Sequence, residues 1–379
     1  MRQAQHKNII EFIAAVERGY DRFLMFRWAE EGNLRTFWQT NTRPILTPTV
    51  IRDTVFQMIG LADALHKLHT GNYRTGGESF RHGDLKPENI LCVTISPPSA
   101  THINIPELKI SDMGLAKHHN VATELRPPTS MRYTTTRYEP PEVISPVGFG
   151  QGRSRRYDMW SLGCVILETI IWLLYGNQNL EVFNGKIVDE MGQKSHWFEF
   201  KMKGSHVATV HHHVQSTLRA LRRDQECASG TAMGDLLDIV QTKLLVVKLG
   251  TSTAVGEAGP KSIPGCRIYS EELLESLSHM VRKGELSERY WFTGKSRHSI
   301  DRLVAIPDSE SPIQQTMLFP PPALPRGHRN PIPIIVQEAD DGSQSSQQRT
   351  IMVPVPGLGS PTNARTRRVS CSSVLRTIR

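Results

Sequence analysis

HGDLKPEN, at residues 82–89, is the most informative stretch of this chain, because it places three chemically active side chains in one short segment. Asp84 offers a carboxylate, Lys86 an ammonium and Asn89 an amide. Their spacing fits a tight loop in which the three groups converge on one cavity. Taken alone, such a string is a weak indication of function, because solvated polar side chains are common in loops.

A second motif, DMG at residues 112–114, strengthens that interpretation. Asp112 follows the strand-like run 108–110 and precedes a glycine that allows a sharp turn. Phosphoryl transfer requires a carboxylate that accepts a hydroxyl proton, a cation at the transferred phosphate and hard oxygen ligands for Mg²⁺. The two motifs supply these groups in that order, so together they predict one half of a phosphoryl-transfer site.

Three further features stand in the order found in one protein family. The segment YEPPE at 138–142 resembles that family's A-P-E segment, and DMWSLG at 158–163 resembles the start of its buried central helix. Arg267 stands where the family places the arginine that pairs with the glutamate matching Glu142. The chain therefore resembles a eukaryotic protein kinase catalytic domain, from the end of the small lobe through the large lobe. Five motifs in register argue against a chance match.

The resemblance implies an α+β fold of the protein-kinase type, consisting mainly of the helical large lobe with a small β remnant of the small lobe. The expected domains are a small-lobe remnant with the hinge at 1–40, the large lobe at 41–300 and a disordered tail at 301–379. Composition supports the tail, because 11 of the 24 prolines lie in 307–361 and no aromatic residue follows Phe319.

The resemblance also assigns roles to the residues of the two motifs. Asp84 is expected to orient the substrate hydroxyl and accept its proton, and Lys86 to neutralise the transferred phosphate. Asn89 and Asp112 are expected to hold Mg²⁺ and to belong to the nucleotide site. The implied cofactors are ATP and Mg²⁺, and the implied substrate is a protein. A lysine two residues after the catalytic aspartate is the serine/threonine pattern.

The adenine of ATP is expected at the end of a compact apolar strand, 23–26. Arg27, Trp28 and Ala29 fall where the family's hinge offers backbone groups to adenine, and Phe26 falls at the gatekeeper position. Without the downstream motifs, an ordinary strand and turn would be an equally good interpretation.

The chain departs from the family pattern in two places. Gly83 replaces the arginine that often pairs with a phosphate on the activation segment, which predicts weak dependence on phosphorylation at 134–136. The sequence also contains no G-x-G-x-x-G string and no V-A-I-K-like string. In the family these elements, and the glutamate that anchors the lysine, precede the region matching His6.

Because preorganised electrostatics is the main source of catalysis in this chemistry, the chain as given is expected to be a poor catalyst. Either Met1 is a mis-assigned start of a longer kinase, or the truncation is real. The predicted function is a protein serine/threonine kinase that is impaired in this form. The alternatives are a pseudokinase or interaction module that binds partners without catalysis, and a nonfunctional fragment.

Charge and cysteine usage narrow the expected partners and compartment. The net charge is +8 and the pI is about 9.3, but no basic stripe alternates with aromatic residues, so nucleic acid is not expected. The five cysteines form no C-x-x-C pair, which fits an intracellular protein in the cytoplasm or nucleus. Glu168 interrupts the apolar run 159–175, so a buried helix is predicted and no membrane partner is expected.

Hydrophobic periodicity predicts several other helices. A long helix is expected at 49–69 with Thr47 or Thr49 as its N-cap, and another is expected to begin at Ser270. The stripe 207–221 and the run 236–249 also look helical.

Two further segments leave alternatives open. The triplet His211-His212-His213 lies inside the predicted 207–221 helix. Metal binding is an option for it, but consecutive helical side chains diverge by about 100°, which favours a solvated or partly packed run. In the tail, PPPALP at 320–325 is either a polyproline II segment that docks a partner or a plain linker.

Overall fold

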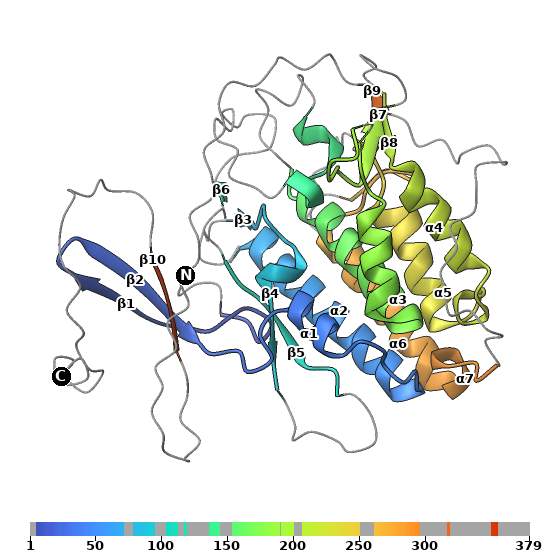
Figure 1. Ribbon diagram of the computed structural model, residues 1–379, viewed down its shortest axis with the longest axis horizontal. Coiled ribbons are helices and arrows are strands. Elements are labelled where there is room, and N and C mark those ends of the chain that lie inside the picture. Colours follow the sequence, from blue (N-terminus) through green and yellow to red (C-terminus); the bar gives the residue numbers. More distant parts are fainter. Residues whose placement is uncertain are drawn as a thin grey trace.

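The computed structural model of this protein describes residues 5–71, 79–94, 104–112, 117–119, 136–144, 154–189, 191–200, 207–250, 261–295, 317–318 and 350–354. In these ranges the helices gather into one body and short strands lie beside it (Figure 1). The helices are α1 Leu34–Thr40, α2 Pro48–Thr70, α3 Arg156–Gly185, α4 His212–Arg222, α5 Ala232–Ile239, α6 Ser270–Leu286 and α7 Glu288–Trp291.

The strands form small antiparallel sheets. They are β1 Phe12–Arg18, β2 Asp21–Arg27, β3 Ser79–Arg81, β4 Ile90–Val93, β5 Glu107–Ile110, β6 Lys117–His119, β7 Phe198–Phe200, β8 Val207–Val210, β9 Met317–Leu318 and β10 Thr350–Pro354. Single helical turns are η3 Pro87–Asn89, η6 Thr136–Tyr138, η7 Pro141–Val143, η8 Gln225–Cys227 and the π-turn η9 Val240–Leu244. Helices with a small β component confirm the predicted α+β class.

Helix α3 is the centre of the hydrophobic core (Figure 1). Trp160 is 0 % exposed and Trp172 is 1 % exposed, and the run predicted to be a buried helix is buried throughout. Within the described residues this helix is long and apolar enough to cross a membrane by composition, but its most apolar window is entirely buried in the protein. The run ends where the helix kinks at Gly176, whose φ of +79° suits glycine.

The long helix expected at 49–69 is α2, and local sequence signals explain both of its ends. The hydroxyl of Thr47 accepts the N–H of Val50 at 3.2 Å, and Pro48 occupies the first turn, where no backbone donor is needed. The helix stops at Gly71, whose N–H donates to the Lys67 carbonyl at 3.1 Å. The N-cap is therefore Thr47.

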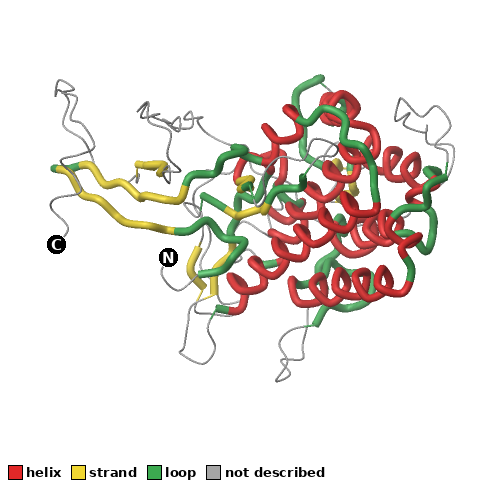
Figure 2. Tube along the Cα trace, turned by 90° about the horizontal axis from the view of Figure 1, so that it is seen from below, coloured by secondary structure: helices red, strands yellow, loops and turns green. Residues whose placement is uncertain are grey.

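The region expected to be the small-lobe remnant contains a ribbon of two strands that extends away from the helical body (Figure 2). Strands β1 and β2 pair in antiparallel register, with Ala15 opposite Leu24, and β10 pairs along the other edge of β2. The strand predicted at 23–26 is confirmed. Residues 5–11, which precede the strands, are not helical, and α1 forms after the ribbon.

The single helix predicted over 207–221 is wrong. Residues 207–210 form β8, which pairs with β7, and α4 begins only at His212. The break occurs because His211 adopts an extended conformation and caps the helix, its Nδ1 accepting the N–H of His213 at 3.1 Å. Its neighbour His212 is already in the first helical turn.

The helix predicted over 236–249 is only partly correct. Helix α5 continues into η9 and stops at Leu244. Beyond that point the carbonyl of Val246 accepts the Nε–H of Arg267 at 2.9 Å, and the Lys248 carbonyl accepts the N–H of the same residue at 2.9 Å. Since these carbonyls accept hydrogen bonds from a residue far away in the chain, the segment after Leu244 is not helical.

Helix α6 begins at Ser270 as predicted, and the carboxylate of Glu272 accepts the N–H of Tyr269 at 2.9 Å to cap it. Of the tail predicted to be disordered, two short strands, β9 and β10, are described. The segment 320–325 lies outside the described residues.

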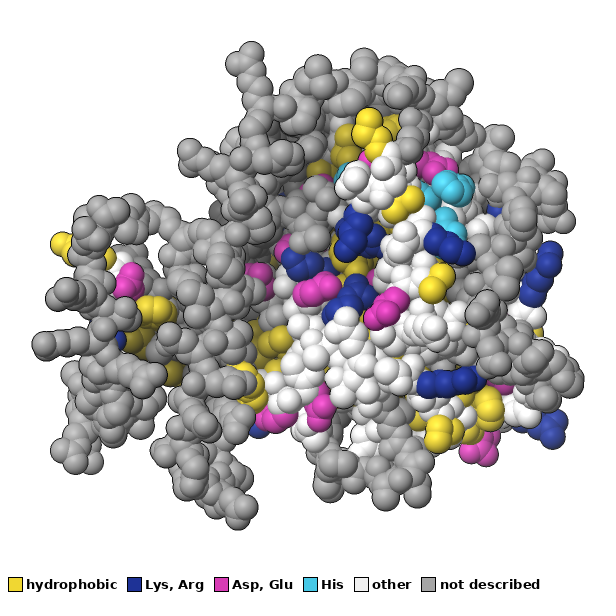
Figure 3. Space-filling view, in the orientation of Figure 1, with side chains coloured by type: hydrophobic (Ala, Val, Ile, Leu, Met, Phe, Trp, Pro, Cys, Tyr) yellow, Lys and Arg dark blue, Asp and Glu magenta, His cyan; other side chains and the backbone are white. Residues whose placement is uncertain are grey.

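Basic and acidic side chains alternate over the described part of the face in Figure 3, where Lys and Arg stand next to Asp and Glu. A surface of mixed sign gives weak long-range attraction to polyanions.

Candidate active site

The structure brings Asp84, Lys86 and Asn89 into direct contact. Lys86 Nζ donates to Asp84 Oδ2 at 2.8 Å. Asn89 Nδ2 donates to the Asp84 carbonyl at 2.8 Å and to Asp84 Oδ2 at 3.1 Å. Asp84 and Asn89 are buried, with exposures of 8 % and 5 %. The convergence predicted from the octapeptide is therefore present in the fold.

The second motif is tied to the first through Ser111. Its backbone N–H donates to the Asn89 carbonyl at 2.9 Å and its hydroxyl donates to the same oxygen at 3.0 Å. Asp112 follows directly, has an exposed side chain and adopts a φ of +57°, which an aspartate tolerates better than most residues. The backbone of Asp112 is thus held beside Asn89, although the two residues are far apart in sequence.

His82 bridges the same two segments from the interior. Its Nε2 lies 2.8 Å from the Ser111 carbonyl, and its Nδ1 accepts the N–H of Asp84 at 3.3 Å. Because a carbonyl only accepts, Nε2 carries a proton and donates it to this bond. His82 is 0 % exposed, so the buried ring fixes the spacing between the two loops.

Asp158, at the start of α3, supports the loop that contains His82, Gly83 and Asp84. The sequence motifs had not assigned it this role. Its Oδ2 accepts the N–H of His82 at 2.9 Å, and its Oδ1 accepts the N–H of Gly83 at 2.9 Å. Oδ2 also lies 2.8 Å from His69 Nε2. Burial raises the pKa of Asp158, but the hydrogen bonds that it accepts from His69 and Gly83 outweigh that effect and the net pKa is lowered. The sequence signal for this residue was its place as the first residue of the motif DMWSLG at 158–163.

Gly83 has a structural reason to be glycine. Its φ is +81°, a conformation that side-chain-bearing residues rarely adopt. In this conformation its N–H reaches Asp158 while Asp84 turns toward Lys86. The residue that replaces the family's arginine is therefore part of the turn that supports the site.

The predicted adenine-binding residues lie at the end of β2. The N–H of Arg27 donates to the Glu11 carbonyl at 3.1 Å, Trp28 is half-buried and Ala29 is 4 % exposed. The Ala29 carbonyl accepts the N–H of Gly32 at 3.2 Å, so the segment turns back toward the helical body.

Two backbone hydrogen bonds connect this turn to the strand that follows the loop of Asp84, Lys86 and Asn89. The N–H of Glu31 donates to the Cys92 carbonyl at 3.2 Å, and the N–H of Cys92 donates to the Gly32 carbonyl at 2.9 Å. Strand β4, which contains Cys92, starts immediately after Asn89. The expected adenine segment is thereby linked to the loop of Asp84, Lys86 and Asn89.

Glu142 and Arg267 form the ion pair that the resemblance implied. Arg267 Nη1 donates to Glu142 Oε1 at 2.6 Å and Nη2 donates to Oε2 at 3.0 Å, which is the bidentate geometry. The guanidinium is 0 % exposed and lies 4.9 Å from the Trp160 ring centroid. Thr134 and Thr135, expected in the activation segment, lie outside the described residues.

The donor set fits Mg²⁺ and a nucleotide. Both amide hydrogens of Asn89 point to Asp84, which directs the Asn89 amide oxygen away from that carboxylate. Asp112 has an exposed side chain, and its carboxylate and the Asn89 amide are hard oxygen donors of the type that Mg²⁺ requires.

The histidine triplet is arranged differently. Glu199 Oε2 lies 2.7 Å from His212 Nδ1 and 3.9 Å from His211 Nε2, close enough to suggest a metal centre. However, His211 Nδ1 accepts the N–H of His213, and Nε2 lies 3.1 Å from the Val188 carbonyl and must carry the proton. His211 then has no lone pair for a cation, which supports the partly packed alternative.

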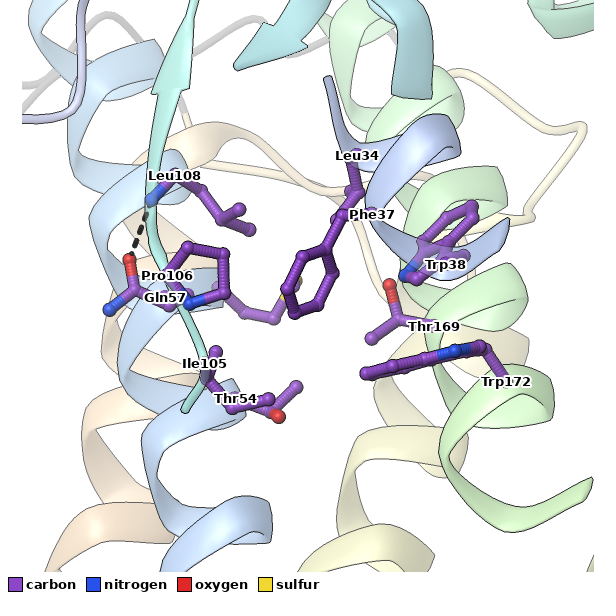
Figure 4. A pocket seen from close by; sticks show the side chains of 11 residues that line it. Leu34, Phe37, Trp38, Thr54, Gln57, Ile105, Pro106, Leu108, Thr169 and Trp172 are labelled. Carbon is purple, nitrogen blue, oxygen red and sulfur yellow. Dashed lines mark hydrogen bonds between the residues drawn. The ribbon is translucent and has the colours of Figure 1, made fainter. Parts of the chain in front are cut away.

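A separate apolar cleft lies between α1, α2, β5 and α3 (Figure 4). It is lined by Leu34, Phe37, Trp38, Thr54, Gln57, Met58, Ile105, Pro106, Leu108, Thr169 and Trp172. The side-chain oxygen of Gln57 accepts the N–H of Leu108 at 2.9 Å, so the amide closes one wall. No titratable side chain lines this cleft, and it offers nothing to phosphoryl-transfer chemistry.

The fold and the polar loop together define a catalytic domain of the protein-kinase type. The sequence profile of the protein kinase domain matches residues 1–228, and the chain belongs to that family.

Curated relatives agree with this assignment. The chain is 29 % identical over 168 residues to a probable serine/threonine-protein kinase of Dictyostelium discoideum, covering 44 % of this chain and 27 % of the relative. It is 27 % identical over 173 residues to the serine/threonine-protein kinase ICK of Rattus norvegicus, covering 44 % and 22 %. It is 29 % identical over 186 residues to myosin light chain kinase 2, skeletal/cardiac muscle, of Mus musculus, covering 48 % and 26 %. The matches thus span about a quarter of these relatives' length.

Proposed function

We propose that this chain transfers the γ-phosphate of ATP to a serine or threonine hydroxyl of a protein substrate. The observation that carries the proposal is the contact of Asp84 with both Lys86 and Asn89 in a loop that Ser111 ties to Asp112. Serine/threonine kinases among the curated relatives support the hydroxyl class of substrate.

In this proposal Asp84 accepts the proton of the substrate hydroxyl. The ammonium of Lys86, 2.8 Å from Asp84 Oδ2, places a cation where the phosphoryl group meets the hydroxyl. Asn89 and Asp112 hold Mg²⁺, which when bound neutralises charge on the phosphates. The backbone of Arg27, Trp28 and Ala29 positions the adenine.

The rate of transfer is proposed to be low for the chain as given. Its sequence has no G-x-G-x-x-G loop, so the backbone N–H cradle that usually contacts the phosphates is not provided by that motif. An intracellular location and a partner at the proline-rich tail belong to the same proposal. The cysteine usage and tail composition described above support them.

The first experiment measures Mg²⁺-dependent ATP binding to the full chain by thermal shift. ATP at about 100 times its dissociation constant stabilises the native state by about 2.7 kcal/mol. Asp112→Asn should remove most of the Mg²⁺-dependent part of the thermal shift. Asparagine suits this test because it tolerates the positive φ of this position. Asp53→Asn, an exposed acid on α2, is the matched control and should leave the shift unchanged.

The second experiment measures transfer of labelled phosphate from ATP to a mixture of serine- and threonine-containing peptides. Asp84→Asn should lower the rate by about a hundredfold or more while ATP affinity stays similar. Binding without any transfer that depends on Asp84 would favour the pseudokinase alternative. Absence of Mg²⁺-dependent nucleotide binding would refute the proposal.

A further inference from the structure

Arg35, on α1, donates hydrogen bonds to side chains from three other segments. Its Nε donates to Glu88 Oε1 at 3.1 Å, in η3. Its Nη2 donates to the hydroxyl of Tyr138 in η6 at 2.5 Å. The same nitrogen donates to Oε1 of Glu168 in α3 at 3.1 Å. Neither the sequence motifs nor the proposed function gave this arginine a role.

The positive charge of Arg35 compensates a buried carboxylate. Glu168 is 0 % exposed, and it accepts hydrogen bonds from the Tyr138 hydroxyl at 3.0 Å and from Asn184 Nδ2 at 2.8 Å. Burial lowers the pKa of Arg35, but Glu168, Tyr138 and Glu88 outweigh it and the net pKa is raised. Arg35 therefore stays charged and balances a buried carboxylate.

Glu88 connects this ion cluster to the chemistry. It lies within η3, between Lys86 and Asn89, and the N–H of Asn89 donates to the Lys86 carbonyl at 2.9 Å to close that single turn. Pro87 restricts φ at the first position of the turn. In so short and constrained a turn, a fixed Glu88 also fixes the two functional side chains on either side of it.

The position of Arg35 is itself set by the adenine segment. Helix α1 starts after the turn that follows Ala29, and Asn33 caps it by accepting the N–H of Thr36 at 3.0 Å. Asn33 also forms a β-bridge with Leu91 of β4. Arg35 thus lies on the element that joins the expected adenine segment to the catalytic loop.

We propose that Arg35 is a positioning residue for phosphoryl transfer, which acts through Glu88 to hold Lys86 and Asn89 in their catalytic arrangement. This inference rests on the proposed function, but its structural half is independent of catalysis. Arginine suits the role because its planar fork reaches two carboxylates at once, whereas a lysine ammonium is a compact point charge.

The first test measures amide hydrogen exchange of the full chain in a peptide covering 82–92. Glu88→Ala cuts the link without leaving an unpaired buried charge, because Arg35 keeps its ion pair with Glu168 at 3.1 Å. Exchange in this peptide should become about tenfold faster, whereas exchange in α3 should not change. Arg52→Ala, a 49 % exposed arginine on α2, is the matched control.

Arg35→Ala and Arg35→Lys complete the series. Arg35→Ala should also accelerate exchange in 82–92, and added guanidinium ion at low millimolar concentration should restore part of the protection. In Arg35→Lys, protection of 82–92 from exchange should lie below that of the wild type, because one ammonium cannot reproduce the planar fork of the guanidinium. Unchanged exchange in both Glu88→Ala and Arg35→Ala would overturn the proposal, whether or not the chain is an active kinase.

If the wild-type chain transfers phosphate, steady-state kinetics test whether Glu88 and Arg35 affect that transfer. Glu88→Ala should lower kcat about tenfold to a hundredfold with KM for ATP within about twofold, since small misplacements of reacting groups have effects of this size. An increase in peptide KM at unchanged kcat would identify a substrate-binding role and overturn the positioning role. If the wild-type chain shows no transfer at all, the proposed function fails while the exchange result still decides the role of Arg35.

Discussion

The carboxylate of Asp158 accepts the backbone N–H of His82 at 2.9 Å, across a separation of 76 positions in the chain. Through this bond the central helix supports the loop that contains Asp84. Both oxygens of Asp158 act only as acceptors, toward His82, Gly83 and His69. The loop that contains Asp84 is therefore attached to α3, which is buried along most of its length.

Asp158→Asn should destabilise the fold by about 3 kcal/mol. The amide replaces one buried acceptor by a donor, which then faces N–H groups and leaves them unpaired. Urea unfolding followed by circular dichroism measures the change. Asp53→Asn, on the exposed side of α2, should stay within about 0.5 kcal/mol of wild type. A loss below about 1 kcal/mol for Asp158→Asn would contradict the supporting role.

Glu142→Ala should cost about 3–5 kcal/mol, because it leaves the buried guanidinium of Arg267 without its bidentate partner. Asp238→Ala removes the partner of Arg222 in a pair whose side chains are 53 % and 33 % exposed. That control should lose less than about 1 kcal/mol. Equal losses in the two variants, again from urea unfolding, would mean that burial of the first pair contributes nothing.

Gly83→Ala should destabilise by about 1–2 kcal/mol, because the φ of +81° is unfavourable for a residue with a Cβ. Gly83→Arg should lose at least as much, although it introduces the residue common in the family. Gly185→Ala is the control, since an added Cβ there meets no atom within 4 Å. It should be neutral or stabilising by up to about 1 kcal/mol. Thermal or urea unfolding of the three variants decides the matter.

Stability should fall as the pH drops from about 6.5 to about 4. Burial lowers the pKa of His213 from 6.5 to about 4 and also lowers those of His69 and His211. In this window the unfolded chain binds protons that the folded chain does not, so acidification favours unfolding. His213→Gln should reduce the slope of unfolding free energy against pH by up to about 1.4 kcal/mol per unit. Identical slopes for variant and wild type would exclude His213 as a contributor.

Phosphorylation at 134–136 should change transfer activity by far less than a hundredfold, because Gly83 offers no cation to a phosphate. Kinase assays on chains phosphorylated in this segment and on Thr→Ala variants would measure the effect. Activation by about a hundredfold would show that another cation takes the place of the missing arginine.

Local sequence signals predicted the elements whose ends they encode. The cap at Thr47, the apolar run of α3 and the acidic start of α6 are local features, and all three appear where expected. The prediction failed over 207–221, where hydrophobic spacing suited both a strand followed by a helix and one continuous helix. Pairing of β8 with β7 and the cap made by His211 selected the first arrangement, and neither is visible in periodicity.

The sequence by itself determined which chemical groups this protein can bring to the proposed phosphoryl-transfer site, because their types and spacing lie within two short motifs around Asp84 and Asp112. Only the tertiary structure decided what holds those groups in place. Asp158, His82 and Arg35 act through hydrogen bonds to segments far away in the chain. Such partners depend on how helices and loops pack, and packing is a property of the whole chain that local spacing does not encode.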